Sequence, residues 1–184
     1  MIARTDIVEV RLHPSVVRLV RGLAHAAELG GYSCVRSGSR LPELQVDQFV
    51  GQLGECALSI QQTGSVGAYL RNRRIRNADP HRGDDGRDLL GGNIDVKTSL
   101  MRSNKDPLQY HLLVRPRERH EENVYVLGLV PALPVREAWV WLVGWCPDAA
   151  LPTETSRDGR FTGAYAVGAR ELRPVVSLPC LPGS

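Results

Sequence analysis

The sequence predicts an α/β protein in which a central mixed sheet of about five strands is flanked by helices. Two observations lead to this fold class. Residues 124–130 and 138–145 are near-continuous apolar runs, which is typical of strands buried on both faces. Residues 14–29 and 44–62 repeat apolar side chains at helical spacing, so helices are available to cover such a sheet. The length of 184 residues and the hydrophobic content of 42% fit a single domain over residues 1–184.

The N-terminal half predicts one strand and two helices. Residues 7–12 alternate polar and apolar side chains, as a short strand does. Pro14 favours the first turn of a helix, and Gly30 favours its end. The second helix carries one apolar stripe, formed by Phe49, Leu53, Cys56 and Ile60. Gly51 and Gly54 weaken this helix on their own, so we expect another backbone to approach it closely there.

The C-terminal half predicts further strands over residues 109–114, 124–130, 138–145 and 164–167. In the third of these, Trp139, Trp141 and Trp145 all have odd numbers, so we expect them to share one face. Residues 63–86 are too polar for us to assign a regular element. Residues 115–123 are interpreted as a charged connection that is mostly solvated.

Composition excludes several classes of protein. No apolar run approaches the length of about 18 residues that a membrane span requires. The first residues lack the apolar segment of a signal peptide, so we expect a cytoplasmic protein. The four cysteines form no CxxC pair, which favours reduced thiols over a zinc site. A net charge of +3 is only mildly basic and does not by itself require a nucleic-acid partner.

A hairpin is predicted within residues 86–99. Two short apolar runs flank Gly91-Gly92, and both central positions of a type I′ turn require φ > 0, which favours glycine. This register places Asp88 opposite Asp95, and directly opposed side chains share a face. Lys97 follows two residues after Asp95, so it points to the same side. One face of the hairpin therefore carries two carboxylates and an ammonium.

The chemistry of this face favours a bound cation. Two opposed carboxylates repel one another, and a divalent cation removes the repulsion. Aspartate oxygens are ligands that Mg²⁺ and Mn²⁺ prefer. Ile94 and Val96 point to the opposite, apolar face. Lysine occurs only at Lys97 and Lys105 among 23 basic residues, so a lysine beside two acids indicates a specific need for a compact ammonium.

Asp88 followed by Asp95-Val96-Lys97 resembles the PD-(D/E)XK nuclease superfamily, whose fold is restriction-endonuclease-like. The resemblance implies metal-dependent hydrolysis of DNA phosphodiester bonds. An endonuclease is the favoured form, and the residues leave endo and exo action open. Asp88 and Asp95 would then bind Mg²⁺ together with the Val96 carbonyl, and Mn²⁺ would substitute for Mg²⁺. Lys97 would be the catalytic lysine that orients the attacking water or stabilises the transition state.

Other acids bear on this assignment. The residue before the first acid is Arg87, where the family pattern has proline, and Asp84 and Asp85 are alternative first acids. Residues 51–57 resemble the N-terminal helix segment of many family members. That likeness implies that Glu55 is a third acid facing the metal, with a catalytic role. Taken alone, Glu55 has the character of a solvated glutamate.

A basic cluster precedes the hairpin. Its members are Arg71, Arg73, Arg74 and Arg76. Arginines next to an acidic metal site suit a protein that binds a phosphate backbone, so we expect these four to contact nucleic acid. A solvated charged loop is the alternative interpretation.

The residues leave other functions open. One is a non-catalytic nucleic-acid-binding or assembly protein that retains the nuclease fold. Another is a metal-dependent hydrolase of a different phosphate ester. A binding module should show no Mg²⁺-dependent rise in melting temperature, which separates it from a metalloenzyme. Many members of the resembled superfamily act as dimers, so a homodimer is compatible with the nuclease hypothesis.

Overall fold

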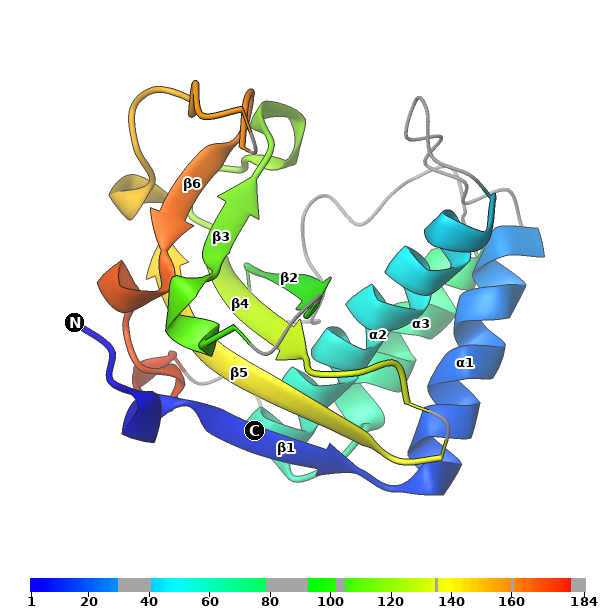
Figure 1. Ribbon diagram of the computed structural model, residues 1–184. Helices are drawn as coiled ribbons and strands as arrows, with labels where there is room; N and C mark the ends of the chain where they lie inside the picture. Colours follow the sequence, from blue (N-terminus) through cyan, green and yellow to red (C-terminus); the bar gives the residue numbers. More distant parts are fainter. Residues whose placement is uncertain (30–40, 79–92, 102–104, 135, 160, 180–184) are drawn as a thin grey trace.

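The computed structural model describes residues 1–29, 41–78, 93–101, 105–134, 136–159 and 161–179 (Figure 1). Within these residues, three α-helices lie side by side on one face of a sheet. The helices are α1 (Pro14–Leu29), α2 (Leu41–Thr63) and α3 (Gly67–Ala78). The strands are β1 (Val8–Leu12), β2 (Ile94–Leu100), β3 (His111–Val114), β4 (Val124–Val130), β5 (Ala138–Pro147) and β6 (Tyr165–Gly168).

The main sheet has the strand order β1-β5-β4-β2. Strand β4 pairs antiparallel with β5 and parallel with β2, so the sheet is mixed. Helix α2 contacts each of its four strands and has α1 and α3 beside it (Figure 1). The predicted α/β class is therefore confirmed, and the two most apolar segments are the central strands, as expected.

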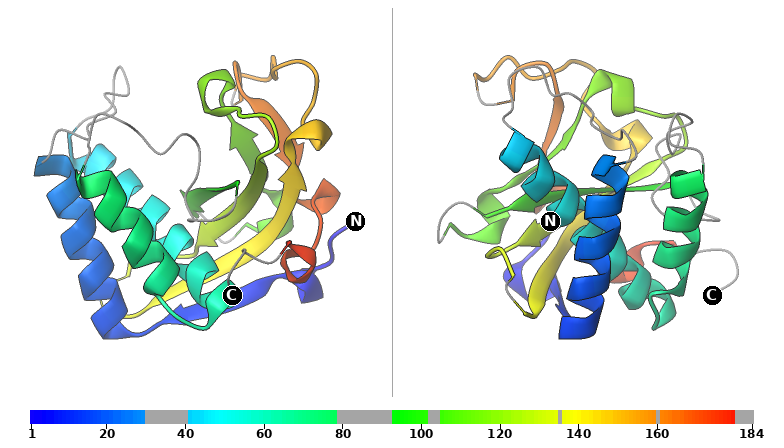
Figure 2. Two further views of the ribbon diagram at one scale, coloured as in Figure 1. Left: turned by 180° about the vertical axis from the view of Figure 1, so that it is seen from behind. Right: turned by 90° about the vertical axis from the view of Figure 1, so that its right-hand side faces the viewer.

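The second sheet consists of β3 and β6, paired antiparallel. It packs on the face of the main sheet that the helices leave open (Figure 2). Leu112 and Val114 of β3 point into an apolar cluster with Leu127 and Leu129 of β4. The prediction of one sheet of about five strands is therefore corrected to a four-stranded and a two-stranded sheet. Strand β3 packs its apolar side on the main sheet and does not extend that sheet.

The helix-side core lies between α2 and the main sheet. Leu53 and Leu58 of α2 are fully buried against Val126 and Leu142 of the central strands. Val20 brings α1 into the same cluster. None of the described helices is both long and apolar enough to cross a membrane.

Residues 67–78 form helix α3, although the sequence suggested no regular element there. The sequence pattern does not reveal this helix because its buried side carries polar as well as apolar residues. Ala68, Tyr69, Asn72 and Arg73 are all buried, at the spacing of one helical face. Half of that face is polar, so a search for an apolar stripe does not detect it.

The three tryptophans do not share a face, which corrects the expectation from their odd numbers. Leu127 pairs with Gly144 and Gly128 with Leu142, so Val143 is an extra residue in β5. Such a β-bulge shifts every later side chain to the other face. As a result Trp145 packs in the helix-side core, whereas Trp141 borders the opposite cluster.

Candidate active site

Strand β2 presents its charged side chains as the sequence predicts. Ile94 and Val96 point into the helix-side core. Asp95 and Lys97 point to the other face, where Lys97 Nζ lies 2.8 Å from Asp95 Oδ2. Asp95 is only 4% exposed, so its carboxylate is held in a largely dry environment. The aspartate and the lysine of the D-x-K motif are therefore in direct contact.

A second carboxylate reaches the same ammonium from a distant part of the chain. Glu118 Oε2 lies 3.2 Å from Lys97 Nζ, and Arg115 Nη1 lies 3.7 Å from the other oxygen of Glu118. Sequence reasoning placed both residues in a solvated connection. Arg115 and Glu118 are three residues apart around a 3₁₀ turn, and this spacing was the available signal that they form a pair. Their approach to Lys97 depends on the path from β2 to β4, which no local pattern specifies.

The floor beside Asp95 is formed by β4. Tyr125 pairs with Asp95 in the parallel register and is fully buried. Its hydroxyl accepts a hydrogen bond of 2.8 Å from the backbone N–H of His120. Burial raises the pKa of Tyr125, and the carboxylates of Asp148 and Asp95 raise it further. Tyr125 is therefore a neutral phenol next to the ion pair, and it gives this part of the floor a fixed shape.

A pocket of about 380 Å³ opens above Lys97. Asp47 and Gly51 of α2 form one wall, and β2 forms the floor. The other wall comes from β3 and from the segment 161–164. In Figure 1, α2 and the β3–β6 pair accordingly stand on opposite sides of β2. The pocket has the size of a small-molecule site, which is about 300–1,000 Å³.

Charges of both signs line this pocket. Asp47 and Glu118 contribute two carboxylates to its lining, and Lys97 and Arg115 contribute two cations. The ammonium of Lys97 is flanked by two carboxylates, those of Asp95 and Glu118. Two carboxylates beside this ammonium weaken its attraction for a phosphate, and a bound cation would offset them. The electrostatics of the described residues therefore favour binding of a cation together with any phosphate substrate.

Glu55 does not serve as a ligand in the arrangement that the structure shows, contrary to the expectation from the family resemblance. It is buried between α2 and α3, where Nη2 of Arg73 donates to both of its carboxylate oxygens. Arg73 is itself only 4% exposed. Its proposed contact with nucleic acid is corrected for the same reason, because its guanidinium is engaged with Glu55.

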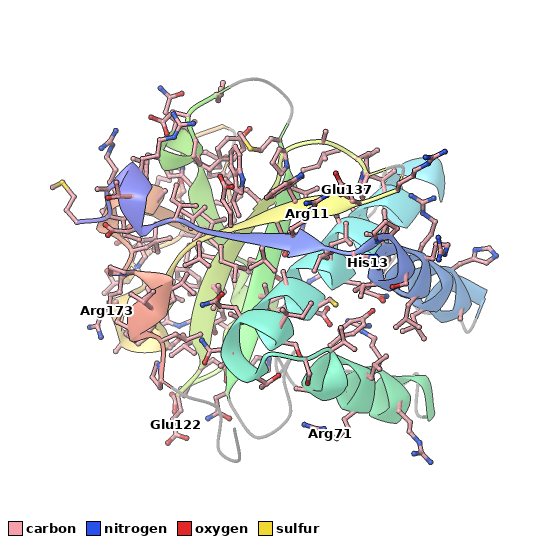
Figure 3. All side chains as sticks on the ribbon, turned by 90° about the horizontal axis from the view of Figure 1, so that it is seen from below. Arg11, His13, Arg71, Glu122, Glu137 and Arg173 are labelled. Carbon is pink, nitrogen blue, oxygen red and sulfur yellow. The ribbon has the colours of Figure 1, made fainter. Side chains whose placement is uncertain are left out.

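Two of the other clustered arginines remain at the surface. Arg71 and Arg74 are exposed on α3, and Figure 3 shows Arg71 on the outer side of this helix. They are three residues apart and so lie on neighbouring positions of one helix face. The side chain of Arg76 is outside the described residues. Arg71 and Arg74 are therefore the accessible members of the predicted basic cluster.

The predicted first acid, Asp88, lies outside the described residues, as do its alternatives Asp84 and Asp85 and the Gly91-Gly92 turn. Within the described chain no group of three or more His, Cys, Asp or Glu side chains is arranged to hold a metal ion. The Asp95 carboxylate and the Val96 carbonyl are oxygen donors of the kind that Mg²⁺ prefers. These two donors fit a hard divalent cation as part of a site, and Glu55 does not.

Comparison of the chain with family models, with curated proteins and with solved structures finds no match. The functional argument therefore rests on the pocket above Lys97 and on the residues that line it.

Proposed function

We propose that this protein is a Mg²⁺-dependent nuclease that hydrolyses DNA phosphodiester bonds in the pocket above Lys97. The observation that supports the proposal is the contact between Asp95 and Lys97 at the floor of an open pocket that charges of both signs line. An acid and an amine at this spacing on one strand are the reacting groups that the resemblance to the PD-(D/E)XK superfamily implies.

The role of Lys97 follows from its position. Its side chain is 22% exposed, so the ammonium is fixed by Asp95 and Glu118 and is still accessible from the pocket. Attack of water on phosphorus increases the negative charge on the phosphoryl oxygens, and a preorganised cation stabilises that charge. The water loses a proton, the P–O ester bond breaks, and the departing alkoxide gains a proton. Lys97 orients the water or stabilises the charge during this step.

Asp95 and the Val96 carbonyl would hold Mg²⁺, with Asp88 as the expected further ligand outside the described residues. A bound Mg²⁺ supplies a water of lowered pKa and neutralises phosphate charge. Mn²⁺ should substitute for it, because it prefers the same oxygen ligands. Arg71 and Arg74 on α3 would contact the phosphate backbone away from the reacting bond.

The test is a cleavage assay on supercoiled plasmid, linear duplex and single-stranded DNA with Mg²⁺, Mn²⁺ or EDTA. We expect metal-dependent cleavage that falls by roughly 10²–10³-fold or more in Lys97→Ala, the size of effect seen when one charge-stabilising donor is removed. Lys105→Ala is the matched control, because it removes the other lysine of the chain from an exposed position. Full activity in Lys97→Ala would contradict the proposed role.

One observation favours the alternative of a non-catalytic nucleic-acid-binding module. Lys97 bridges two carboxylates, and such a network also stabilises a fold without any chemistry. This alternative predicts DNA binding without cleavage of any substrate and no Mg²⁺-dependent rise in melting temperature. Hydrolysis of p-nitrophenyl phosphate without cleavage of DNA would instead indicate a hydrolase of another phosphate ester.

A further inference from the structure

An aromatic pair lines the pocket wall opposite α2. His111 begins β3, and the ring of Phe161 lies beside it with the ring centroids 4.6 Å apart and the planes tilted by 39°. Phe161 is fixed by its backbone, because its N–H donates to the carbonyl of Asp158 and its carbonyl accepts from the N–H of Ala164. The pair is thus held in place on the wall.

Packing does not explain the position of Phe161. The described part of the chain contains two hydrophobic clusters, and Phe161 belongs to neither of them. Its side chain is half-buried and lines the pocket together with His111 and Thr162. An aromatic ring outside the core, on a fixed turn and beside a second ring, is a surface on which a planar ligand can stack.

We propose that the pocket binds a single unpaired nucleotide, with its base against the His111–Phe161 pair and its phosphate directed toward Lys97. This inference rests on the proposed function and specifies its substrate class as single-stranded or unpaired nucleic acid. A pocket of about 380 Å³ has room for one nucleotide. A base that is stacked and paired has no free face to offer the aromatic pair.

The two halves of the ligand depend on different forces. Stacking on an aromatic pair requires no counter-charge, so the base should bind whether or not a metal is present. The phosphate would approach Lys97, whose ammonium is already flanked by the carboxylates of Asp95 and Glu118. It should therefore bind more tightly when a divalent cation offsets these carboxylates. Mg²⁺ should therefore strengthen the binding of a nucleotide, which carries a phosphate, and leave the binding of a nucleoside unchanged.

The experiment measures binding of adenosine, dAMP and ribose 5-phosphate to the full chain by saturation-transfer NMR, with Mg²⁺ or with EDTA. We expect adenosine to bind equally in both conditions, with transfer mainly to the base protons. Addition of Mg²⁺ should strengthen binding of dAMP by roughly tenfold or more. Ribose 5-phosphate, which has no base, should bind the most weakly of the three. Each of these comparisons uses the unaltered protein, so none depends on the folding of a variant.

Two variants localise the contact. Phe161→Leu keeps an apolar side chain and removes the ring, so affinity for adenosine should fall by roughly tenfold. Phe161→Tyr keeps the ring and should bind like the parent. Equal binding of ribose 5-phosphate and dAMP, or unchanged adenosine binding by Phe161→Leu, would overturn the inference while leaving the nuclease proposal intact. Conversely, no cleavage of any DNA substrate by the unaltered protein with Mg²⁺ or Mn²⁺ would remove the proposed function and leave base binding as an independent result.

Discussion

The ion pair between Glu55 and Arg73 is the least exposed ion pair among the residues that the structure describes. It joins α2 to α3, and the guanidinium of Arg73 also lies over the ring of Tyr69, 5.8 Å from its centroid. The hydroxyl of Tyr69 in turn donates to the side-chain oxygen of Gln52 over 2.8 Å. The contact between these two helices is therefore built from polar groups, and its strength depends on the partners being present together.

Removal of one partner should destabilise the protein strongly. In Arg73→Met the carboxylate of Glu55 stays buried and loses the cation that compensates it, which costs about 3–5 kcal/mol of unfolding free energy. Arg74→Met changes the next residue, which is exposed, and should cost less than about 0.5 kcal/mol. Urea unfolding of both variants measures the difference.

A second substitution tests whether the lost stability comes from an unpaired buried charge. Glu55→Leu added to Arg73→Met replaces both ions with apolar side chains of similar size, and this should recover most of the lost stability. Equal stability of Arg73→Met and Arg74→Met would show that the pair is not held in a dry environment.

The basic cluster shows why single residues could be assigned only in part from the sequence. Arg71, Arg73 and Arg74 look alike in a run of arginines. Helix α3 then separates them, since Arg73 faces α2 while the other two face solvent. Because the sequence pattern did not predict α3, it could not distinguish the buried arginine from the two exposed ones. The shared face of Asp95 and Lys97, by contrast, followed from strand alternation alone and is confirmed.

At the scale of elements, α2 and β2 meet at a glycine. A Cβ on Gly54 would lie 1.8 Å from Oγ1 of Thr98 and 2.9 Å from its Cβ, so the helix can approach β2 this closely only with glycine here. Gly51, one turn earlier, has open space around the same position. The sequence predicted a close approach at both glycines, and the structure shows it at Gly54.

Alanine at these two glycines should have opposite effects. Gly51→Ala should raise stability by about 0.5–1 kcal/mol, because alanine lowers the entropy of the unfolded chain and meets no obstacle. Gly54→Ala gains the same entropy and must push Thr98 aside, so we expect a net loss of about 1–3 kcal/mol. Thermal unfolding of the pair provides the measurement. A stabilised Gly54→Ala would mean that the contact between α2 and β2 is looser than described.

Strand β5 shows the limit of element prediction. Its existence and its central place follow from its apolar composition and are confirmed. The bulge at Val143 has no signal in that composition, because an extra apolar residue in an apolar run looks like any other. The face of every residue after it is therefore reversed relative to the pattern, as Trp145 shows.

At the scale of the whole molecule, the main sheet separates two hydrophobic cores. One core lies between the main sheet and the helices, and the other lies between the main sheet and the β3–β6 sheet. Figure 2 shows the helices and the β3–β6 sheet on opposite sides of the main sheet. The class of the fold and the central strands were predictable, since both depend on local patterns. The parallel pairing of β2 with β4, and with it the position of Glu118, depends on long-range contacts that a single sequence does not encode locally.

Each core contains one buried thiol, Cys56 on the helix side and Cys146 on the other. Burial raises the pKa of each thiol from an ordinary 9.0 to about 12, and the nearby carboxylates of Glu55 and Asp148 add to the effect. A raised pKa in the folded state means that the thiols contribute their full stability below pH 9. That contribution is lost as pH rises from 9 toward 12, because the unfolded chain releases the protons first.

This linkage tests whether the two cores unfold together. At pH 10 each thiol should lower the unfolding free energy by about 1.4 kcal/mol relative to pH 7.5. The test uses a background with Cys34→Ser and Cys180→Ser. Cys56→Ala and Cys146→Ala each remove one titrating thiol, so the unfolding free energy of each variant should fall by about 1.4 kcal/mol less than that of the background between pH 7.5 and pH 10. The packing cost of each substitution cancels in this comparison, because it lowers the unfolding free energy equally at both pH values. One urea transition that responds to both substitutions would show a single cooperative unit across the sheet. Two transitions, each responding to one thiol, would show that the helix-side core and the β3–β6 core unfold separately.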